Sequence, residues 1–357
     1  AEHPDGVQVP REILADATRS IINPVDSPDI GFSWTINPYR GCEHGCIYCY
    51  ARPEHERLGF SIGLDFETRI VAKHDAPRLF REELSSRRWA RVVAENGGAS
   101  PTIVMSGITD PYQPVERELE ITRGILRVAV EFRQPMSIIT KNRLILRDLD
   151  LLQELARLNA FRAAISITTL DHALAAKMEP RASSPTSRLE AVRRLSAAGI
   201  PVTVMVAPII PGITDHEMPA ILKAASRAGA VNAGYVLLRL PHRVKDLFLE
   251  WLVRHFPDRA QRVESLIRQT RDGALYDPRF GERQRGNGAV AQQLSQAFAV
   301  FRRKYRLDRT AAPIDGSAFR VPGELFGASS TIQRPGHASS SSSVPRRDAN
   351  QLELFSD

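Results

Sequence analysis

The sequence predicts an α/β protein built on a parallel sheet. Six short apolar runs rich in β-branched residues recur between residues 33 and 240. Amphipathic stretches with the period of a helix separate these runs. Buried parallel strands show such continuous apolar character, and each is followed by a crossover helix. Six consecutive β-α units fit either a doubly wound sheet or a partial barrel, and the pattern alone does not separate the two.

The individual elements follow from the same pattern. We expect strands at residues 33–37, 102–106, 136–140, 163–168, 202–207 and 234–240. We expect helices at residues 76–88, 115–132, 146–158, 185–198, 215–228 and 244–255. Glycine and proline separate the elements, as Gly199 and Pro201 do between the fourth helix and the fifth strand.

Composition changes along the chain predict four regions. Residues 1–30 form an N-terminal extension, and 31–245 form the α/β core. Residues 246–309 are arginine-rich with helical periodicity, broken by a polar stretch at 277–288, and form a C-terminal α-helical appendage. The tail at 310–357 is rich in Gly, Pro and Ser and includes five consecutive serines at 339–343. Such a segment has too few apolar residues to form a core, so we expect it to be disordered.

Composition also limits the class of protein. The chain has 357 residues, of which 43% are hydrophobic, enough for one large core with an appendage. No apolar run approaches the roughly 18 residues that a membrane span needs, so we expect no membrane partner. The net charge is +7, but only six of the 48 basic residues are lysine. An arginine excess of this kind supports nucleic-acid binding only weakly.

All three cysteines lie in one eight-residue window, at Cys42, Cys46 and Cys49. Soft thiolate ligands select iron-sulfur clusters or zinc. A cubane 4Fe-4S cluster held by three cysteines has one iron without a protein ligand. Zinc with His44 or His55 as the fourth ligand is the alternative, and a disulfide would leave one thiol over. An odd cysteine count without a signal peptide leads us to expect a reduced, cytoplasmic protein.

The cysteine spacing, with Tyr48 before the last cysteine, resembles the signature of the radical SAM superfamily. The resemblance implies a 4Fe-4S cluster whose open iron binds S-adenosylmethionine (SAM). One electron from the cluster then releases a 5'-deoxyadenosyl radical, and a reductant such as flavodoxin or ferredoxin supplies the electron. The resemblance also implies a partial (β/α)6 TIM-type barrel with the cysteine loop at its mouth.

In such barrels the chemistry gathers at the C-terminal ends of the strands. The resemblance therefore implies that SAM is bound there. The loop after the second strand would contact its amino group, Lys141 its carboxylate and Ala207 its adenine. The candidate cofactor-binding residues are Tyr48, Ser106, Gly107, Thr109, Asp110, Lys141, Ser166 and Ala207.

Five segments resemble the spore photoproduct lyase-like branch of this superfamily. They are CIYCY (46–50), GITDPYQPVE (107–116), TK (140–141), EPR (179–181) and VAPIIPG (206–212), and the likeness covers residues 37–288. The lyase reverses a thymine dimer lesion in DNA. The resemblance therefore implies a nucleic-acid substrate and a role like that of a DNA-repair enzyme.

The chain differs from the lyase in one important residue. The lyase returns a hydrogen atom through an additional cysteine, and this chain has no fourth cysteine. Either a tyrosine donates instead, with Tyr50 and Tyr112 as the candidate catalytic residues, or the chain catalyses a different reaction. Two other functions stay open: a radical SAM enzyme that modifies a protein, an RNA or a small molecule, and a zinc-stabilised binding module.

The segment QLELF at residues 351–355 resembles the peptide by which bacterial replication and repair proteins dock on the sliding clamp. Gln351, Leu352, Leu354 and Phe355 are the residues that would fill the apolar cleft of the clamp. The serine run would act as a flexible tether. The resemblance implies the sliding clamp as a partner and DNA as the place of action, whereas a short pattern of this kind also arises by chance.

Overall fold

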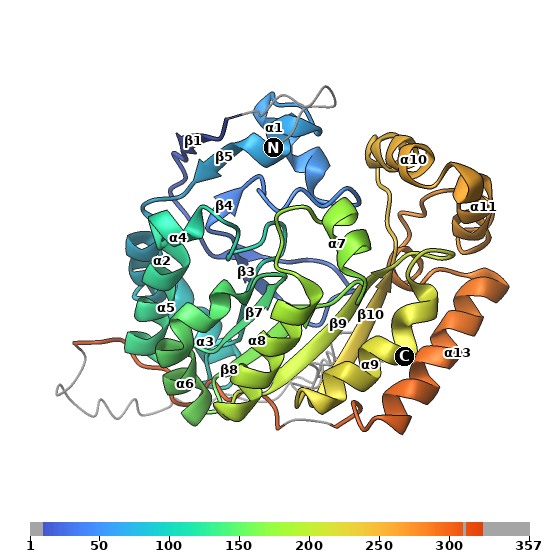
Figure 1. The fold of residues 1–357 in the computed structure, drawn as a ribbon. Coiled ribbons are helices and arrows are strands. Elements are labelled where there is room, and N and C mark those ends of the chain that lie inside the picture. Colours follow the sequence, from blue (N-terminus) through green and yellow to red (C-terminus); the bar gives the residue numbers. More distant parts are fainter. Residues whose placement is uncertain (1–9, 310–311, 324–357) are drawn as a thin grey trace, which may run out of the picture.

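A computed structural model of the chain describes residues 10–309 and 312–323. Its main sheet has the strand order β10-β9-β8-β7-β6-β3-β2. The sheet curves into a partial barrel with helices on its outer face (Figure 1), which confirms the predicted fold class. Six strands are parallel and consecutive: β3 (Trp34–Ile36), β6 (Ile103–Met105), β7 (Met136–Thr140), β8 (Phe161–Ser166), β9 (Val202–Ile209) and β10 (Asn232–Leu237).

These six strands are the six that the sequence predicts. Strand β7 matches its prediction at both ends, and the others differ by one to three residues. Neighbouring strands pair in register, as Ile36 does with Met105 and Met105 with Ile138. All six C-terminal ends therefore lie at the same edge of the sheet. Strand β2 (Asn23–Pro24) pairs antiparallel with β3 at the other margin.

The helices that connect the strands follow the prediction, but four of the predicted stretches each include parts of two elements. The stretch at 76–88 is two helices because Ser86 has extended backbone and caps the second, accepting a hydrogen bond from Trp89 N at 3.2 Å. The stretch at 115–132 divides at Glu120, whose φ is +49°. The observed helices are α2 (Ala76–Leu84), α3 (Arg87–Glu95), α4 (Glu116–Leu119), α5 (Ile121–Phe132), η2 (Arg143–Asp148), α6 (Leu149–Arg157), α8 (Pro185–Ala197), η3 (Asp215–Glu217), α9 (Met218–Arg227) and α10 (Val244–His255).

A smaller sheet and two short helices stand above the barrel mouth. The sheet has the order β1-β5-β4, with β1 (Glu12–Ala15), β4 (Tyr39–Arg40) and β5 (Arg69–Ala72). Helices η1 (Arg52–Leu58) and α1 (Leu64–Thr68) lie between β4 and β5 in sequence. Helix α7 (His172–Met178), which the sequence analysis missed, follows β8 and is capped by Asp171. Strands β1 and β2 lie within the predicted N-terminal extension, so part of that extension is hydrogen-bonded to the sheets.

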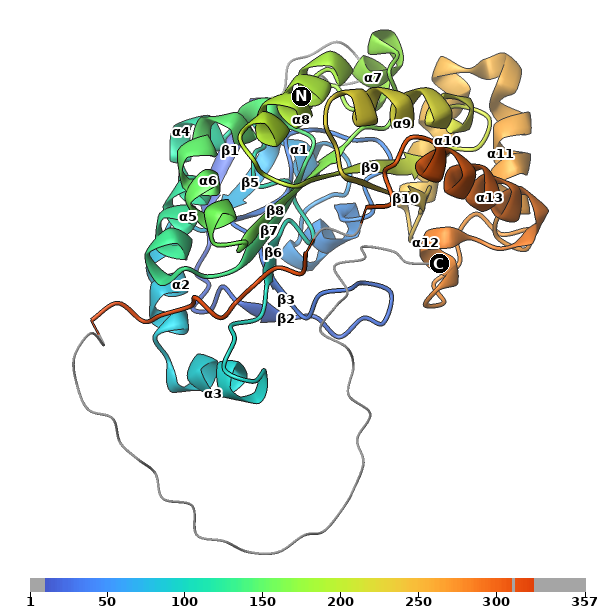
Figure 2. The ribbon, with the colours of Figure 1, turned by 90° about the horizontal axis from the view of Figure 1, so that it is seen from below.

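The C-terminal region is helical, as the sequence predicts. It contains η4 (Pro257–Arg259), α11 (Ala260–Gln269), α12 (Glu282–Arg285) and α13 (Gly288–Lys304). Residues 312–323 then run beneath the sheet (Figure 2), where Ser100 N donates to Gly316 O at 3.1 Å and Arg320 N donates to Phe132 O at 2.9 Å. Packed chain therefore extends beyond 310, the predicted start of the tail. The QLELF segment lies outside the described residues.

A continuous apolar core fills the space between the sheet and its helices. Outward-facing strand residues such as Ile138 and Val204 meet helix residues such as Leu126 and Leu222 in this core. The inward-facing side chains of the strands leave space inside the barrel. Among the helices of the described part of the chain, none has the length and apolar character to cross a bilayer.

Candidate active site

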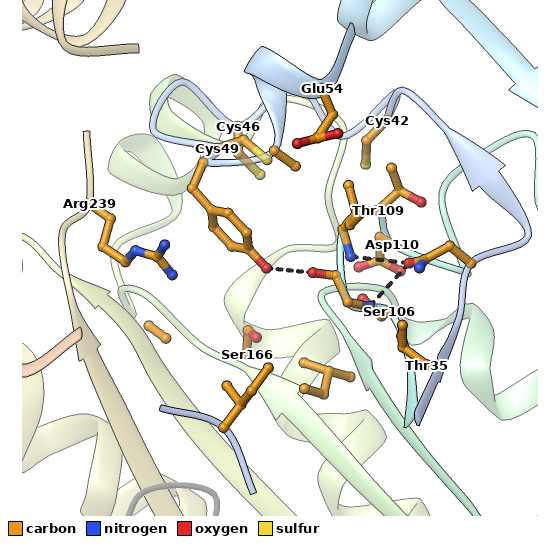
Figure 3. A pocket seen from close by; sticks show the side chains of 18 of the residues that line it. Thr35, Cys42, Cys46, Cys49, Glu54, Ser106, Thr109, Asp110, Ser166 and Arg239 are labelled. Atoms are coloured by element: carbon orange, nitrogen blue, oxygen red, sulfur yellow. Dashed lines mark hydrogen bonds between the residues drawn. The ribbon is translucent and has the colours of Figure 1, made fainter. Parts of the chain in front are cut away.

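A cavity of about 980 Å³ opens at the C-terminal ends of the parallel strands. The cysteine loop forms one wall, and the ends of β6 to β10 form the facing walls (Figure 3). Its volume is at the upper end of the range for small-molecule and cofactor sites. All three cysteines line it, together with the eight candidate cofactor-binding residues and Tyr50.

The cysteine loop is held in shape by contacts to its main chain. The Arg52 guanidinium donates from Nε and Nη2 to Cys46 O, at 3.1 and 3.0 Å. Arg181 donates from Nε to Glu43 O, and Ile47 N donates to Met178 O at 3.0 Å. Gly45 has a φ of +66°, a value that favours glycine, and a Cβ there would lie 2.6 Å from the Arg181 side chain. The loop therefore has little freedom to move.

The three thiols are free and face the cavity along its upper wall (Figure 3). Burial raises the pKa of Cys46 to about 12 and raises that of Cys42 well above its usual value. Burial also raises the pKa of Cys49. A cationic group bound at the thiols would supply the positive charge that thiolates need there. Three adjacent cysteines beside an open cavity fit a cluster that takes one cysteine at each of three irons.

The zinc alternative fits less well. Both ring nitrogens of His44 have partners, Asp110 at 3.4 Å and Asn142 at 3.1 Å. The Nε2 atom of His55 lies 3.1 Å from Arg69 O, and its ring packs against two phenylalanines. Neither imidazole is therefore placed as the fourth ligand that the alternative needs.

Asp110 lies at the junction of two strand ends. It accepts hydrogen bonds from Thr140 Oγ1 at 2.7 Å and Lys141 N at 2.8 Å. Burial would raise its pKa, but His44 and these hydrogen bonds outweigh burial and lower the pKa to about 2. Asp110 lines the cavity as predicted, yet most of its hydrogen-bonding capacity is used inside the protein. Its role in the structure is to join the ends of β6 and β7.

The loop after β6 has an unusual backbone. Ser106 has a φ of +91°, which is rare for a residue with a side chain. Asn37 Oδ1 accepts hydrogen bonds from both Gly107 N and Ile108 N, each at 3.1 Å. Thr109 Oγ1 donates to Tyr39 O at 2.9 Å. Asn37 was not a candidate in the sequence analysis, although it follows the first strand and the strand-end rule could have identified it.

Lys141, Ser166 and Ala207 line the cavity at the ends of β7, β8 and β9. The Lys141 Nζ lies 5.9 Å from the centre of the Tyr48 ring. Burial alone would lower the pKa of Lys141, but its electrostatic interactions with the Cys46 sulfur and the Glu179 carboxylate outweigh burial and raise the pKa. Lys141 is therefore a retained positive charge beside the cysteines.

The three candidate tyrosines have different surroundings. The Tyr48 hydroxyl donates to the buried carboxylate of Glu179, which also pairs with Arg188. The Tyr50 hydroxyl donates to Gly107 O at 2.7 Å, and its side chain is 45% exposed. Tyr112 is fully buried in the apolar core and does not line the cavity.

The structure therefore does not bring Tyr112, which the sequence analysis named as a candidate catalytic residue, to the cavity. Its main-chain N–H donates to Asp110 Oδ1 at 2.9 Å, which forms a tight turn directly after the strand-end loop. That turn places the side chain in the core, although it is only two residues from a residue that lines the cavity.

Several further residues line the cavity that sequence reasoning did not select. Lys73 is 6% exposed, and burial lowers its pKa to about 8. Arg239 follows β10, and Gln284 comes from α12. Glu54 projects beside the cysteines (Figure 3). No local sequence signal marks Gln284, because its place at the cavity depends on how the appendage packs.

The chain is similar in sequence to a known protein family and to proteins of other organisms. Residues 36–225 match the Radical SAM superfamily. Protein Rv2578c of Mycobacterium tuberculosis is 32% identical over 322 residues, which cover 89% of this chain and 87% of the relative. Protein MJ0683 of Methanocaldococcus jannaschii is 30% identical over 58% of this chain and 71% of its own length.

Solved structures show the same fold. A spore photoproduct lyase complexed with dinucleoside spore photoproduct aligns with a TM-score of 0.59 and 17% identity. The alignment covers 82% of this chain and 79% of the lyase. A variant of the lyase in which serine replaces one cysteine aligns with a TM-score of 0.58, also at 17% identity. At this identity the likeness concerns the fold.

Proposed function

Because the chain belongs to the radical SAM superfamily, we propose that it is an enzyme that cleaves SAM at a 4Fe-4S cluster held by Cys42, Cys46 and Cys49. The observation that carries this proposal is the position of three free thiols on one wall of a cavity whose other walls are strand ends. When bound, the cluster and SAM supply reductive cleavage of a carbon-sulfur bond and a 5'-deoxyadenosyl radical. The protein supplies placement and exclusion of water.

The residues around the cavity have separate tasks in this proposal. Lys141 offers a positive charge to the carboxylate of SAM, and the loop from Ser106 to Thr109 offers polar atoms to its amino group. Ser166 and Ala207 border the space for its nucleoside. Tyr48 and Asp110 hold the cysteine loop and the strand ends in place through Glu179 and Thr140. Tyr50, half-exposed at the cavity, is the candidate hydrogen-atom donor.

For the substrate we propose a nucleic acid. Of the four arginines that line the cavity, three pair with carboxylates, and Arg239 has no such partner among the described residues. The Arg239 guanidinium, with weaker support from the net charge of +7, favours a polyanion. A solved lyase of the same fold holds a dinucleoside photoproduct. The absence of a fourth cysteine argues for a reaction other than the reversal that the lyase catalyses. The reductant would be a small electron carrier such as flavodoxin or ferredoxin.

The cofactor chemistry is tested by reconstituting the full chain anaerobically. We expect about four irons per chain, a broad brown absorbance, and 5'-deoxyadenosine formation from SAM with dithionite. Cys46→Ala should lose both the cluster and the product. One zinc per chain in a colourless solution, or SAM cleavage by the Cys46→Ala variant, would contradict the proposal. Adding DNA or RNA then tests whether nucleic acid increases deoxyadenosine formation.

The QLELF segment supports a DNA-linked role through docking on the sliding clamp. We propose that the segment binds the apolar cleft of the clamp, with Leu354 and Phe355 as the main contacts. Binding of the full chain to immobilised bacterial clamp measures this directly. Leu354→Ala with Phe355→Ala should abolish binding, and Ser356→Ala is the matched control. Equal binding by both variants would contradict the docking proposal and leave the cofactor chemistry unaffected.

A further inference from the structure

Two side chains on the β10 side of the cavity carry polar atoms without a partner. Nε of Arg239 and Oε1 of Gln284 are buried and make no hydrogen bond to any described residue, and both side chains line the cavity. A buried donor or acceptor without a partner is unfavourable. Because both side chains line the cavity, a bound ligand toward which they turn would supply the missing partners.

The structure holds the main chain before Arg239 close to the main chain before Gln284. Arg271 is almost fully buried, and its Nη2 donates to Leu238 O at 3.0 Å and to Arg283 O at 3.1 Å. These carbonyls belong to the residues directly before Arg239 and Gln284. The Arg271 guanidinium thus links two segments that are far apart in the sequence.

The contacts of Gly286, directly after α12, show that this helix packs closely against β10. A Cβ on Gly286 would lie 2.8 Å from Leu237 Cδ1 and 2.8 Å from Thr270 O. The neighbouring Asp29 accepts a hydrogen bond from Gly281 N at 2.6 Å and pairs with Arg283. The segment that carries Gln284 is therefore anchored on two sides. The main-chain position of Gln284 is therefore fixed by the fold.

Arg239 differs from Arg283, the neighbouring arginine at the cavity. Arg283 is paired with Asp29 and also donates to Ser27 Oγ at 2.6 Å. No carboxylate in residues 10–309 and 312–323 pairs with Arg239. Its guanidinium lies 4.8 Å from the centre of the Tyr50 ring and projects into the pocket (Figure 3). A planar guanidinium held against an aromatic ring is preorganised for an anionic group.

We propose that Arg239 and Gln284 form a substrate subsite that binds one nucleotide of a nucleic-acid strand. The guanidinium binds the phosphate through charge-assisted hydrogen bonds, and the Gln284 side chain turns toward the nucleotide so that its Oε1 accepts an N–H from the edge of the base. The subsite rests on the nucleic-acid substrate of the proposed function. It adds which residues recognise the substrate, and it places the bound nucleotide beside Tyr50.

The test measures binding of a fluorescent single-stranded oligonucleotide to the reconstituted enzyme over a series of salt concentrations. Arg239→Gln should weaken binding about tenfold and reduce the slope of log affinity against log salt by about 0.7, the value for one phosphate contact on a single strand. Gln284→Leu should weaken binding without changing that slope. Arg193→Gln is the matched control, because Arg193 is exposed on α8 and pairs with Glu190.

The possible results of this experiment distinguish an error in the proposed subsite from an error in the proposed function. If the wild type binds the oligonucleotide and Arg239→Gln binds as tightly as Arg193→Gln, the subsite is wrong and the nucleic-acid substrate stands. If the wild type binds no oligonucleotide, both the nucleic-acid substrate and the subsite are wrong. Iron content and thermal melting verify the fold of each variant. Arg239→Lys, which keeps the charge without the planar fork, should retain the salt slope and bind with intermediate affinity.

Discussion

The carboxylate of Glu67 holds the guanidinium of Arg52, with 2.5 Å between Oε1 and Nη2. Arg52 in turn donates to Cys46 O. The other carboxylate oxygen of Glu67 pairs with Arg181, which donates to Glu43 O. One carboxylate on α1 thereby anchors two arginines that hold the cysteine loop at two points. The positions of the thiols depend on a residue that touches none of them.

We expect Glu67→Ala to lower both the stability of the protein and its capacity to hold iron. The substitution leaves the almost fully buried Arg52 without its carboxylate, which costs about 3 kcal/mol. Glu190→Ala removes a carboxylate from an exposed pair and should change the stability little. Denaturant unfolding and iron per chain after reconstitution measure the two effects. Equal iron content in both variants would show that the loop does not need this anchor.

Gly45→Ala should lose iron to a greater extent than Gly59→Ala. Both glycines have positive φ, +66° and +78°, so both alanines carry a backbone strain of about 1–2 kcal/mol. Only at Gly45 would the Cβ also meet the Arg181 and Glu67 side chains, each at 2.6 Å. At Gly59 no atom lies within 4 Å. The difference in iron content between the two variants therefore measures the effect of the Cβ contacts at Gly45. Equal losses of iron would mean that backbone strain alone causes the loss.

Lys73 should give the protein a stability that rises between pH 8 and 10.5. Burial lowers the folded-state pKa of Lys73 from 10.5 to about 8, so in this window the unfolded chain binds a proton that the folded chain does not. Below pH 8 the cost of burial is present in full, at about 3 kcal/mol. Lys73→Met should remove that cost and that rise, whereas Lys223→Met, on the exposed surface of α9, should keep the rise. Urea unfolding at pH 7 and pH 10 measures both, and a wild-type rise that survives in Lys73→Met would contradict the assignment.

Tyr50→Phe and Tyr112→Phe should affect catalysis differently. If the Tyr50 hydroxyl returns a hydrogen atom to the substrate, reactions in D2O should place deuterium in the product, and Tyr50→Phe should lose most of that label. Tyr112→Phe should label its product as the wild type does, because Tyr112 lies in the core away from the cavity. Mass spectrometry of the product gives the result. Loss of label in Tyr112→Phe but not in Tyr50→Phe would reverse the assignment.

The strands were predictable because each is buried on both faces. Runs such as residues 136–140 and 202–207 are mostly apolar or β-branched, and the structure has strands over both. Predicted helix 76–88 failed as one element because a single serine side chain caps a new helix at Ser86. Helix α7 was missed because it has only seven residues, too short for periodicity to be visible.

The candidate site was predictable where it depends on residues that are close in sequence or that end parallel strands. The cysteines are neighbours in sequence, and Lys141, Ser166 and Ala207 end parallel strands, whose C-terminal ends must share one edge. Tyr112 was expected at the cavity and lies in the core, because proximity in sequence does not determine the direction of a side chain after a tight turn.

The sequence by itself determined the six β-α units, the cysteine triplet and the edge of the sheet at which the chemistry lies, because each depends on periodicity or spacing within a short segment. Only the tertiary structure decided that Glu67 anchors the cysteine loop, that Lys73 is buried beside the cavity, and that Arg239 and Gln284 face the same space. These relationships join segments separated by many residues. They depend on how side chains pack across the fold, and no local pattern encodes that packing.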